Sequence, residues 1–156
     1  MGLDMYLTKE TYIGAQYKHR GVEGEIDLTR QSREEQVPIK IDVSRVSEIT
    51  EEFAYWRKFN ALHNWFVENC AGGVDECQKI YLSKETLEKL LSIVKEVLSD
   101  KEKAPDLLST KSGFFFGPTD YGEWYMKNLR YTEEVLEKAL DEADEPWVDF
   151  YYRASW

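Results

Sequence analysis

The stretch EEFAYWRKFNALHNWFVENCA, residues 51–71, carries the strongest structural signal in the chain. At 100° per residue its large apolar side chains share one wide arc, which is typical of a helix that covers a hydrophobic core. Thr50 can cap the first turn of this helix, and Gly72-Gly73 can end it. We therefore expect a central helix over residues 51–71.

Two more helices are predicted toward the C-terminus. Ser83 precedes an apolar stripe at helical spacing over residues 84–99. Thr119 and Asp120 are cap candidates for a third helical stretch over residues 120–143. Together with the strand-like segments, this pattern predicts an α+β fold in which three main helices pack on a small, mainly antiparallel sheet.

Strand character lies on both sides of the central stretch. Residues 3–18 are rich in Tyr, Ile, Leu and Thr, and residues 147–152 are apolar and aromatic. A short strand is expected around residues 79–82. Residues 113–117 hold three consecutive phenylalanines, which on a strand would point to both faces of the sheet.

A polar arm at about residues 18–45 interrupts what is otherwise a single domain over residues 1–156. Residues 25–29 can pair with residues 39–43 in a hairpin, and the alternation of apolar and polar side chains in the second segment predicts a half-buried strand. Residues 18–36 contain two glycines and few large apolar side chains. We expect this part to exchange its amide hydrogens fastest.

Charge and composition limit the possible functions. The 156 residues hold 30 acidic and 20 basic side chains, a net charge of −10. This balance argues against binding a nucleic-acid backbone and suits a basic partner surface. No apolar run is long enough for a membrane span, the first residues do not form a signal peptide, and two cysteines fit a reducing cytoplasm.

Four motifs stand out by their order and spacing. They are MGLDMYL at residues 1–7, YWRKxNxxHxWF at 55–66, GFFFG at 113–117 and YYxxSW at 151–156. With these motifs the chain resembles a family of small uncharacterised proteins of bacteriophages and prophages. The resemblance implies an accessory protein that acts in the cytoplasm of the host bacterium, and it carries over no established activity.

The sequence offers little catalytic chemistry. His63, Cys70 and Cys77 form the one soft cluster, with Asp75 or Glu76 as a further ligand, but the Cys70-x6-Cys77 spacing is not usual for zinc. No nucleophile elbow and no phosphate-binding glycine pattern is present. We therefore predict no metal, no cofactor and no catalytic residue.

The candidate ligand site combines the central helix with the phenylalanine segment. The helix would place hydrogen-bonding side chains among aromatic rings, and the segment would supply glycines and free N–H groups at a helix start. The predicted site residues are Trp56, Asn60, His63, Phe114, Phe116, Gly117, Thr119, Tyr121 and Trp124. The alternative is that the same residues simply form the core.

Two classes of function follow. The first is a binding or interaction module, acidic and rich in aromatic residues, for a host protein or a small-molecule ligand. The second is a small enzyme that acts on a phosphorylated or nucleotide-like substrate through Arg57, Lys58 and His63. The sequence leaves the oligomeric state open.

Overall fold

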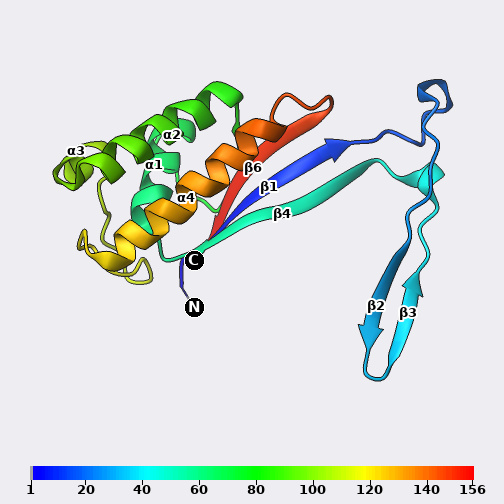
Figure 1. The fold of residues 1–156 in the computed structure, drawn as a ribbon, viewed down its shortest axis with the longest axis horizontal. Helices are drawn as coiled ribbons and strands as arrows, with labels where there is room; N and C mark the ends of the chain where they lie inside the picture. Colours follow the sequence, from blue (N-terminus) through cyan, green and yellow to red (C-terminus); the bar gives the residue numbers. More distant parts are fainter. Residues whose placement is uncertain (1) are drawn as a thin grey trace. The chain divides into compact units, whose positions relative to one another are not determined.

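The computed structural model describes residues 2–156 and shows an α+β fold (Figure 1). Its contacts group the chain into two units. The core unit comprises the chain up to Glu10 together with Glu51–Trp156, and the arm unit comprises Thr11–Thr50. Each unit is described by itself below.

An antiparallel sheet forms the base of the core unit. Its four strands lie in the order β4-β1-β6-β5. Their bounds are Asp4–Tyr12 for β1, Glu48–Arg57 for β4, Ile80–Leu82 for β5 and Val148–Ser155 for β6. The alternation along β1 shows which face is covered, because Met5, Leu7 and Lys9 are buried while the residues between them are only half-buried.

The helices lie on one side of this sheet (Figure 1). Within residues 2–156 the α-helices are α1 Asn60–Cys70, α2 Lys84–Ser99, α3 Ala104–Leu107 and α4 Glu123–Glu142, with a 3-10 turn, η3, at Lys101–Lys103. Helices α2 and α4 pack against each other. In the same part of the chain, no helix is both long and apolar enough to cross a membrane.

The helix predicted over residues 51–71 is wrong in its first half. The chain continues as strand β4 to Arg57, turns at Lys58, and becomes helical only from Asn60. Lys58 has a left-handed φ of 58°, and its N–H donates to Leu3 O at 2.7 Å. Aromatic residues fit strands as well as helices, so pairing with β1 decides for the strand. The predicted end is confirmed by the bond from Gly73 N to Val67 O at 2.9 Å.

The other helix predictions fare better. The helix over 84–99 is confirmed, and Ser83 Oγ accepts from Thr86 N at 3.2 Å as its cap. The third helix begins at Glu123 rather than at residue 120, because the Asp120 carboxylate accepts from Gly122 N in a turn before it. Residues 113–117 are not a strand: turns carry the three phenylalanines.

The arm unit contains a two-stranded antiparallel ribbon. Its strands are β2 Leu28–Ser32 and β3 Glu35–Ile39, with Leu28 opposite Ile39. The predicted pairing of 25–29 with 39–43 is therefore wrong, since both strands lie closer to the turn. The unit also has two 3-10 turns, η1 Lys18–Arg20 and η2 Val43–Arg45.

One charged side chain is buried under α4. Only 9% of the Lys9 side chain is exposed, and its Nζ donates to Glu142 Oε2 at 2.7 Å and to Glu145 Oε2 at 2.9 Å. These two hydrogen bonds raise the pKa of Lys9 well above its usual range, although burial opposes the shift. The cluster joins strand β1 to the C-terminal end of α4.

We predict that Lys9→Met lowers the free energy of unfolding at pH 7 by about 1–2 kcal/mol, because the buried Lys9 loses two charge-assisted hydrogen bonds to glutamates that are themselves partly exposed. The raised pKa means that the contribution is complete below the unfolded-state value near 10.5 and is lost as the pH rises through the higher folded-state value. Denaturant unfolding at pH 7 and at increasing alkaline pH measures this difference between the two proteins.

Lys84→Met is the matched control, since Lys84 pairs with Asp144 on the exposed surface. We expect it to change stability little at any of these pH values. Equal losses of unfolding free energy for the two substitutions at pH 7 would show that the buried Lys9 cluster stabilises the fold no more than an exposed ion pair does.

Candidate functional site

Asn60 is the best-anchored of the predicted site residues. It is buried at the first position of α1. Its Nδ2 donates to Phe116 O at 2.9 Å and to Pro118 O at 2.8 Å, and its Oδ1 accepts from Lys111 N at 2.9 Å. All three contacts hold the loop of residues 111–118 against α1. The amide therefore acts as a clamp inside the protein.

His63 lies one turn further along α1 and is also buried. Its Nε2 is 2.9 Å from Asp75 Oδ2, and its Nδ1 is 2.7 Å from the Tyr152 hydroxyl. A carboxylate only accepts, so Nε2–H donates to Asp75, and in the neutral imidazole Nδ1 then accepts from the Tyr152 hydroxyl. Burial raises the pKa of Tyr152 well above its usual value, which keeps its hydroxyl a donor. Both ring nitrogens thus have partners within the protein.

Trp56 is turned toward α4 from strand β4. Its Nε1 donates to Thr132 Oγ1 at 3.0 Å, and that hydroxyl in turn donates to Asn128 O at 2.7 Å. The Trp56 ring meets Tyr131 edge-on at 5.7 Å. This indole joins the sheet to α4.

The phenylalanine loop divides into a half-buried side and an exposed tip. Phe116 lies edge-on to His63 at 5.4 Å, whereas Phe114 is 93% exposed. Gly117 has a φ of 87°, and a Cβ there would lie 3.0 Å from Lys58 O. The close backbone approach that glycine permits is therefore made by the protein's own Lys58.

The remaining predicted residues line the start of α4. Thr119 is exposed, and its carbonyl accepts from Thr110 Oγ1 at 2.9 Å. The Tyr121 ring meets Tyr125 at 5.0 Å, and Trp124 meets Phe59 at 6.0 Å. The structure thus brings Asn60, His63, Phe116 and Gly117 together.

The residues of the soft cluster, His63, Cys70 and Cys77, lie in different environments. Cys70 is half-buried, and burial raises the pKa of its thiol, while Cys77 is exposed. The Asp75 carboxylate is occupied by His63 and by Trp156 Nε1 at 3.2 Å. Among residues 2–156, no group of three His, Cys, Asp or Glu side chains is placed to hold a metal ion.

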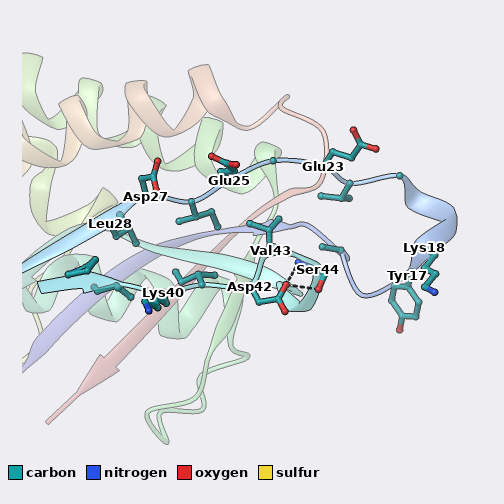
Figure 2. Close-up of a pocket in the computed structure, with 18 of the residues that line it drawn as sticks. Tyr17, Lys18, Glu23, Glu25, Asp27, Leu28, Lys40, Asp42, Val43 and Ser44 are labelled. Atoms are coloured by element: carbon teal, nitrogen blue, oxygen red, sulfur yellow. Dashed lines mark hydrogen bonds between the residues drawn. The ribbon is translucent and has the colours of Figure 1, made fainter.

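A second candidate site lies within the arm unit and is a cavity of about 1100 Å³. Figure 2 shows residues that line it. Its walls are two limbs of the chain. The first limb is residues 21–27, before β2, and the second limb is residues 40–44, after β3. The limbs meet at the ribbon, where Leu28 lies opposite Ile39.

Apolar and acidic side chains both line this cavity. The apolar side chains belong to Val22, Ile26, Leu28, Ile39, Ile41 and Val43. The lining also includes two lysines, Lys18 and Lys40. It includes four acidic residues, Glu23, Glu25, Asp27 and Asp42. Hydrogen bonds from the Ser44 side chain and backbone lower the pKa of Asp42 and keep it charged.

The order of residues 22–28 indicates the extended form of the first limb, although their polar composition does not. Val22, Gly24, Ile26 and Leu28 alternate with acidic residues, which is the period of an extended strand. Ile39 and Ile41 were expected to be half-buried, but they are 42% and 38% exposed, so that prediction is wrong. They have no second layer to pack against within the arm unit, because it consists of turns and one ribbon.

We predict that Asn60→Ala lowers the free energy of unfolding by about 1–3 kcal/mol, because the buried Asn60 side chain loses three hydrogen bonds to the partly buried backbone of the 111–118 loop. Chemical denaturation measures this loss. Asn64→Ala is the matched control on the same helix, since Asn64 is only half-buried, and we expect it to cost less than about 0.5 kcal/mol. Unchanged stability of Asn60→Ala would mean that the loop is held by other contacts.

Comparison with known proteins adds no family to this description. No protein-family model, no curated protein and no solved structure matches the chain. The resemblance to phage and prophage proteins therefore stays a prediction from the four sequence motifs. The function proposed next depends on the geometry of this chain alone.

Proposed function

We propose that this chain is a binding module that engages a protein partner through the arm unit. In line with the sequence motifs, the proposal places it as an accessory protein of a phage or prophage in the cytoplasm of the host bacterium. The observation that carries the binding role is the uncovered apolar face of the β2–β3 ribbon. Two further observations, the open form of the cavity and the environment of His63, support this proposal over the alternatives.

All ten residues of the ribbon are exposed. On one face the register brings Leu28 opposite Ile39 and Arg30 opposite Val37, while the other face carries Thr29, Gln31 and Gln36. Leu28, Val37 and Ile39 are 49%, 45% and 42% exposed. Two-stranded ribbons are only marginally stable in water, so an apolar face of this kind gains stability when a partner covers it.

The cavity favours a polypeptide over a small molecule. Small-molecule sites are usually concave pockets of about 300–1000 Å³ that enclose most of the ligand. The cavity of the arm unit, at about 1100 Å³, lies at the upper end of this range, and its walls are two mostly exposed limbs of chain that leave it open to solvent (Figure 2). A surface of this form can accept an extended segment of another protein.

The enzyme alternative gains no support from the site residues. It requires His63 to reach a substrate, but both ring nitrogens of His63 are already bonded to Asp75 and Tyr152. Arg57 is exposed at the end of β4. The binding role is therefore the function that the geometry supports best.

We predict that Val37→Asp weakens capture of the partner roughly 10- to 100-fold, because burying an apolar valine at an interface contributes about 1.5–3 kcal/mol. The full chain is purified from bacterial cells, and native mass spectrometry measures the partner bound per chain. Because Val37 is exposed, its replacement should leave the melting temperature nearly unchanged.

Gln36→Asp is the matched control, since it adds the same charge to the neighbouring residue on the opposite face of the ribbon. We expect it to retain the partner. Equal loss in both variants would point to charge alone, and unchanged capture by Val37→Asp would refute the arm unit as the binding surface.

A further inference from the structure

We infer that two copies of this chain pair through the outer edge of β2, so that their two-stranded ribbons join into one antiparallel sheet. The inference goes beyond the proposed function, because pairing at this edge leaves the apolar face of each ribbon uncovered. It follows from three features of the arm unit: one strand edge that can accept a further strand, charges along that edge that fit an antiparallel copy, and a net charge near zero.

Pro38 shows which backbone groups of the ribbon point outward. Directly opposite residues of an antiparallel pair alternate between pairs that exchange two hydrogen bonds and pairs that exchange none. Thr29 lies opposite Pro38, which has no N–H to exchange, so these two residues form a pair without hydrogen bonds. The N–H and C=O groups of Thr29 therefore point to the outer edge of β2. By the same alternation, the backbone groups of Gln31 and Gln36 point outward from their own strands.

The two edges of the ribbon differ in what they offer a further strand. The edge of β3 presents Pro38, and a proline at a strand edge blocks pairing because it has no N–H to donate. The edge of β2 presents the N–H and C=O groups of both Thr29 and Gln31. In the described part of the chain, these groups make no backbone hydrogen bond outside the ribbon. The structure therefore favours β2 over β3 as the edge that accepts another strand.

Pairing at this edge stabilises a ribbon that is weak by itself. A two-stranded ribbon is only marginally stable in water, whereas three or more strands with one apolar face can form a stable sheet. All ten residues of β2 and β3 are exposed, so neither strand gains stability from burial within the arm unit. Two copies joined at β2 form a sheet that carries Leu28, Val37 and Ile39 of both copies on one face.

The register of the pair follows from charge and from length. A two-fold pair centred on Arg30 would set the two Arg30 side chains directly opposite each other, and like charges in that position destabilise a sheet. A pair centred on Gln31 would end its overlap at the turn of residues 33–34. A pair centred on Thr29 places Leu28 opposite Arg30 of the second copy, whose aliphatic stem can contact it. We therefore place Thr29 at the two-fold axis.

This register also matches opposite charges. Asp27 precedes β2 and Arg33 follows it, and within residues 2–156 neither side chain forms an ion pair. With Thr29 at the axis, Asp27 lies opposite Gln31 of the second copy and diagonal to its Arg33, on the same face of the sheet. The two-fold symmetry repeats this contact on the other side of the axis. The edge of β2 is therefore complementary to an antiparallel copy of itself.

The arm unit is also the part of the chain where two copies repel each other least. Residues 11–50 hold six basic and seven acidic side chains, a net charge of −1, while the other residues hold 14 and 23, a net charge of −9. Like net charges oppose association, and the opposition is weakest where positive and negative charges balance. A contact between arm units therefore suits two copies of an acidic protein.

Sedimentation velocity of the full chain tests the inference. The interface is small, because main-chain hydrogen bonds and a few side chains join the copies. We therefore expect a reversible dimer with a dissociation constant of roughly 1–100 µM. The sedimentation coefficient should rise from the monomer value to the dimer value as the protein concentration increases from about 1 µM to about 1 mM. A chain that stays monomeric throughout this range overturns the inference.

Thr29→Pro is the variant that tests the edge. It removes the outward N–H of Thr29 and spares the hydrogen bonds within the ribbon, because Thr29 lies in a pair that exchanges none. We expect the dissociation constant to rise at least tenfold. Gln36→Pro is the matched control, since Gln36 has the same outward orientation on the edge that Pro38 already blocks. We expect this variant to dimerise as the unchanged chain does.

Hydrogen exchange of the unchanged chain gives a second readout that needs no substitution. With rising protein concentration, the amides of Thr29 and Gln31 should gain protection, because they donate to the second copy. The amide of Gln36 should gain none, since it lies on the opposite edge of the ribbon. Protection of Gln36 in place of Thr29 overturns pairing at β2.

The remaining outcomes separate this inference from the proposed function. Unweakened dimerisation of Thr29→Pro, or equal weakening by both proline variants, overturns edge pairing at β2. Val37→Asp changes the face of the ribbon and not its edge, so weaker capture of the partner by this variant upholds the proposed function even where no dimer forms. Unchanged capture by Val37→Asp refutes the proposed function, while the sedimentation result still decides the dimer.

Discussion

The packing of the core unit depends on the three hydrogen bonds that the side-chain amide of Asn60 makes. Strand β4 must turn into α1 within two residues, and Lys58 does so in a left-handed conformation that costs free energy. Asn60 stabilises this junction by binding three backbone groups of the loop at 111–118. Gly117 lets that loop approach Lys58 closely enough for the bonds to form. One buried side chain therefore joins sheet, helix and loop.

This use of polar side chains explains why the most conspicuous motif residues do not form an open site. Trp56 and His63 each bond to other elements of the core unit, and within residues 2–156 every buried side-chain nitrogen and oxygen has a hydrogen-bond partner. A buried polar group without a partner destabilises a fold by more than one hydrogen bond stabilises it. The polar atoms of Trp56 and His63 therefore form hydrogen bonds within the core unit.

The arm unit has the opposite character. Its ribbon exposes Leu28, Val37 and Ile39, and its limbs leave backbone groups without partners in the described chain. A monomer gains nothing from uncovered apolar side chains and unpaired strand edges, which favour association. The proposed role in binding another chain rests on these features.

Local sequence was sufficient for some elements and insufficient for others. The helix at 84–99 follows from its apolar period and the Ser83 cap, because both act within a few residues. The strand at 48–57 does not, since its aromatic residues fit either state until β1 pairs with it. Likewise, Asn60 and His63 were identified as important polar residues, but their burial depends on segments that lie 12 to 89 residues away in the chain. Tertiary contacts decided those roles because hydrogen-bond partners distant in sequence cannot be chosen from local pattern.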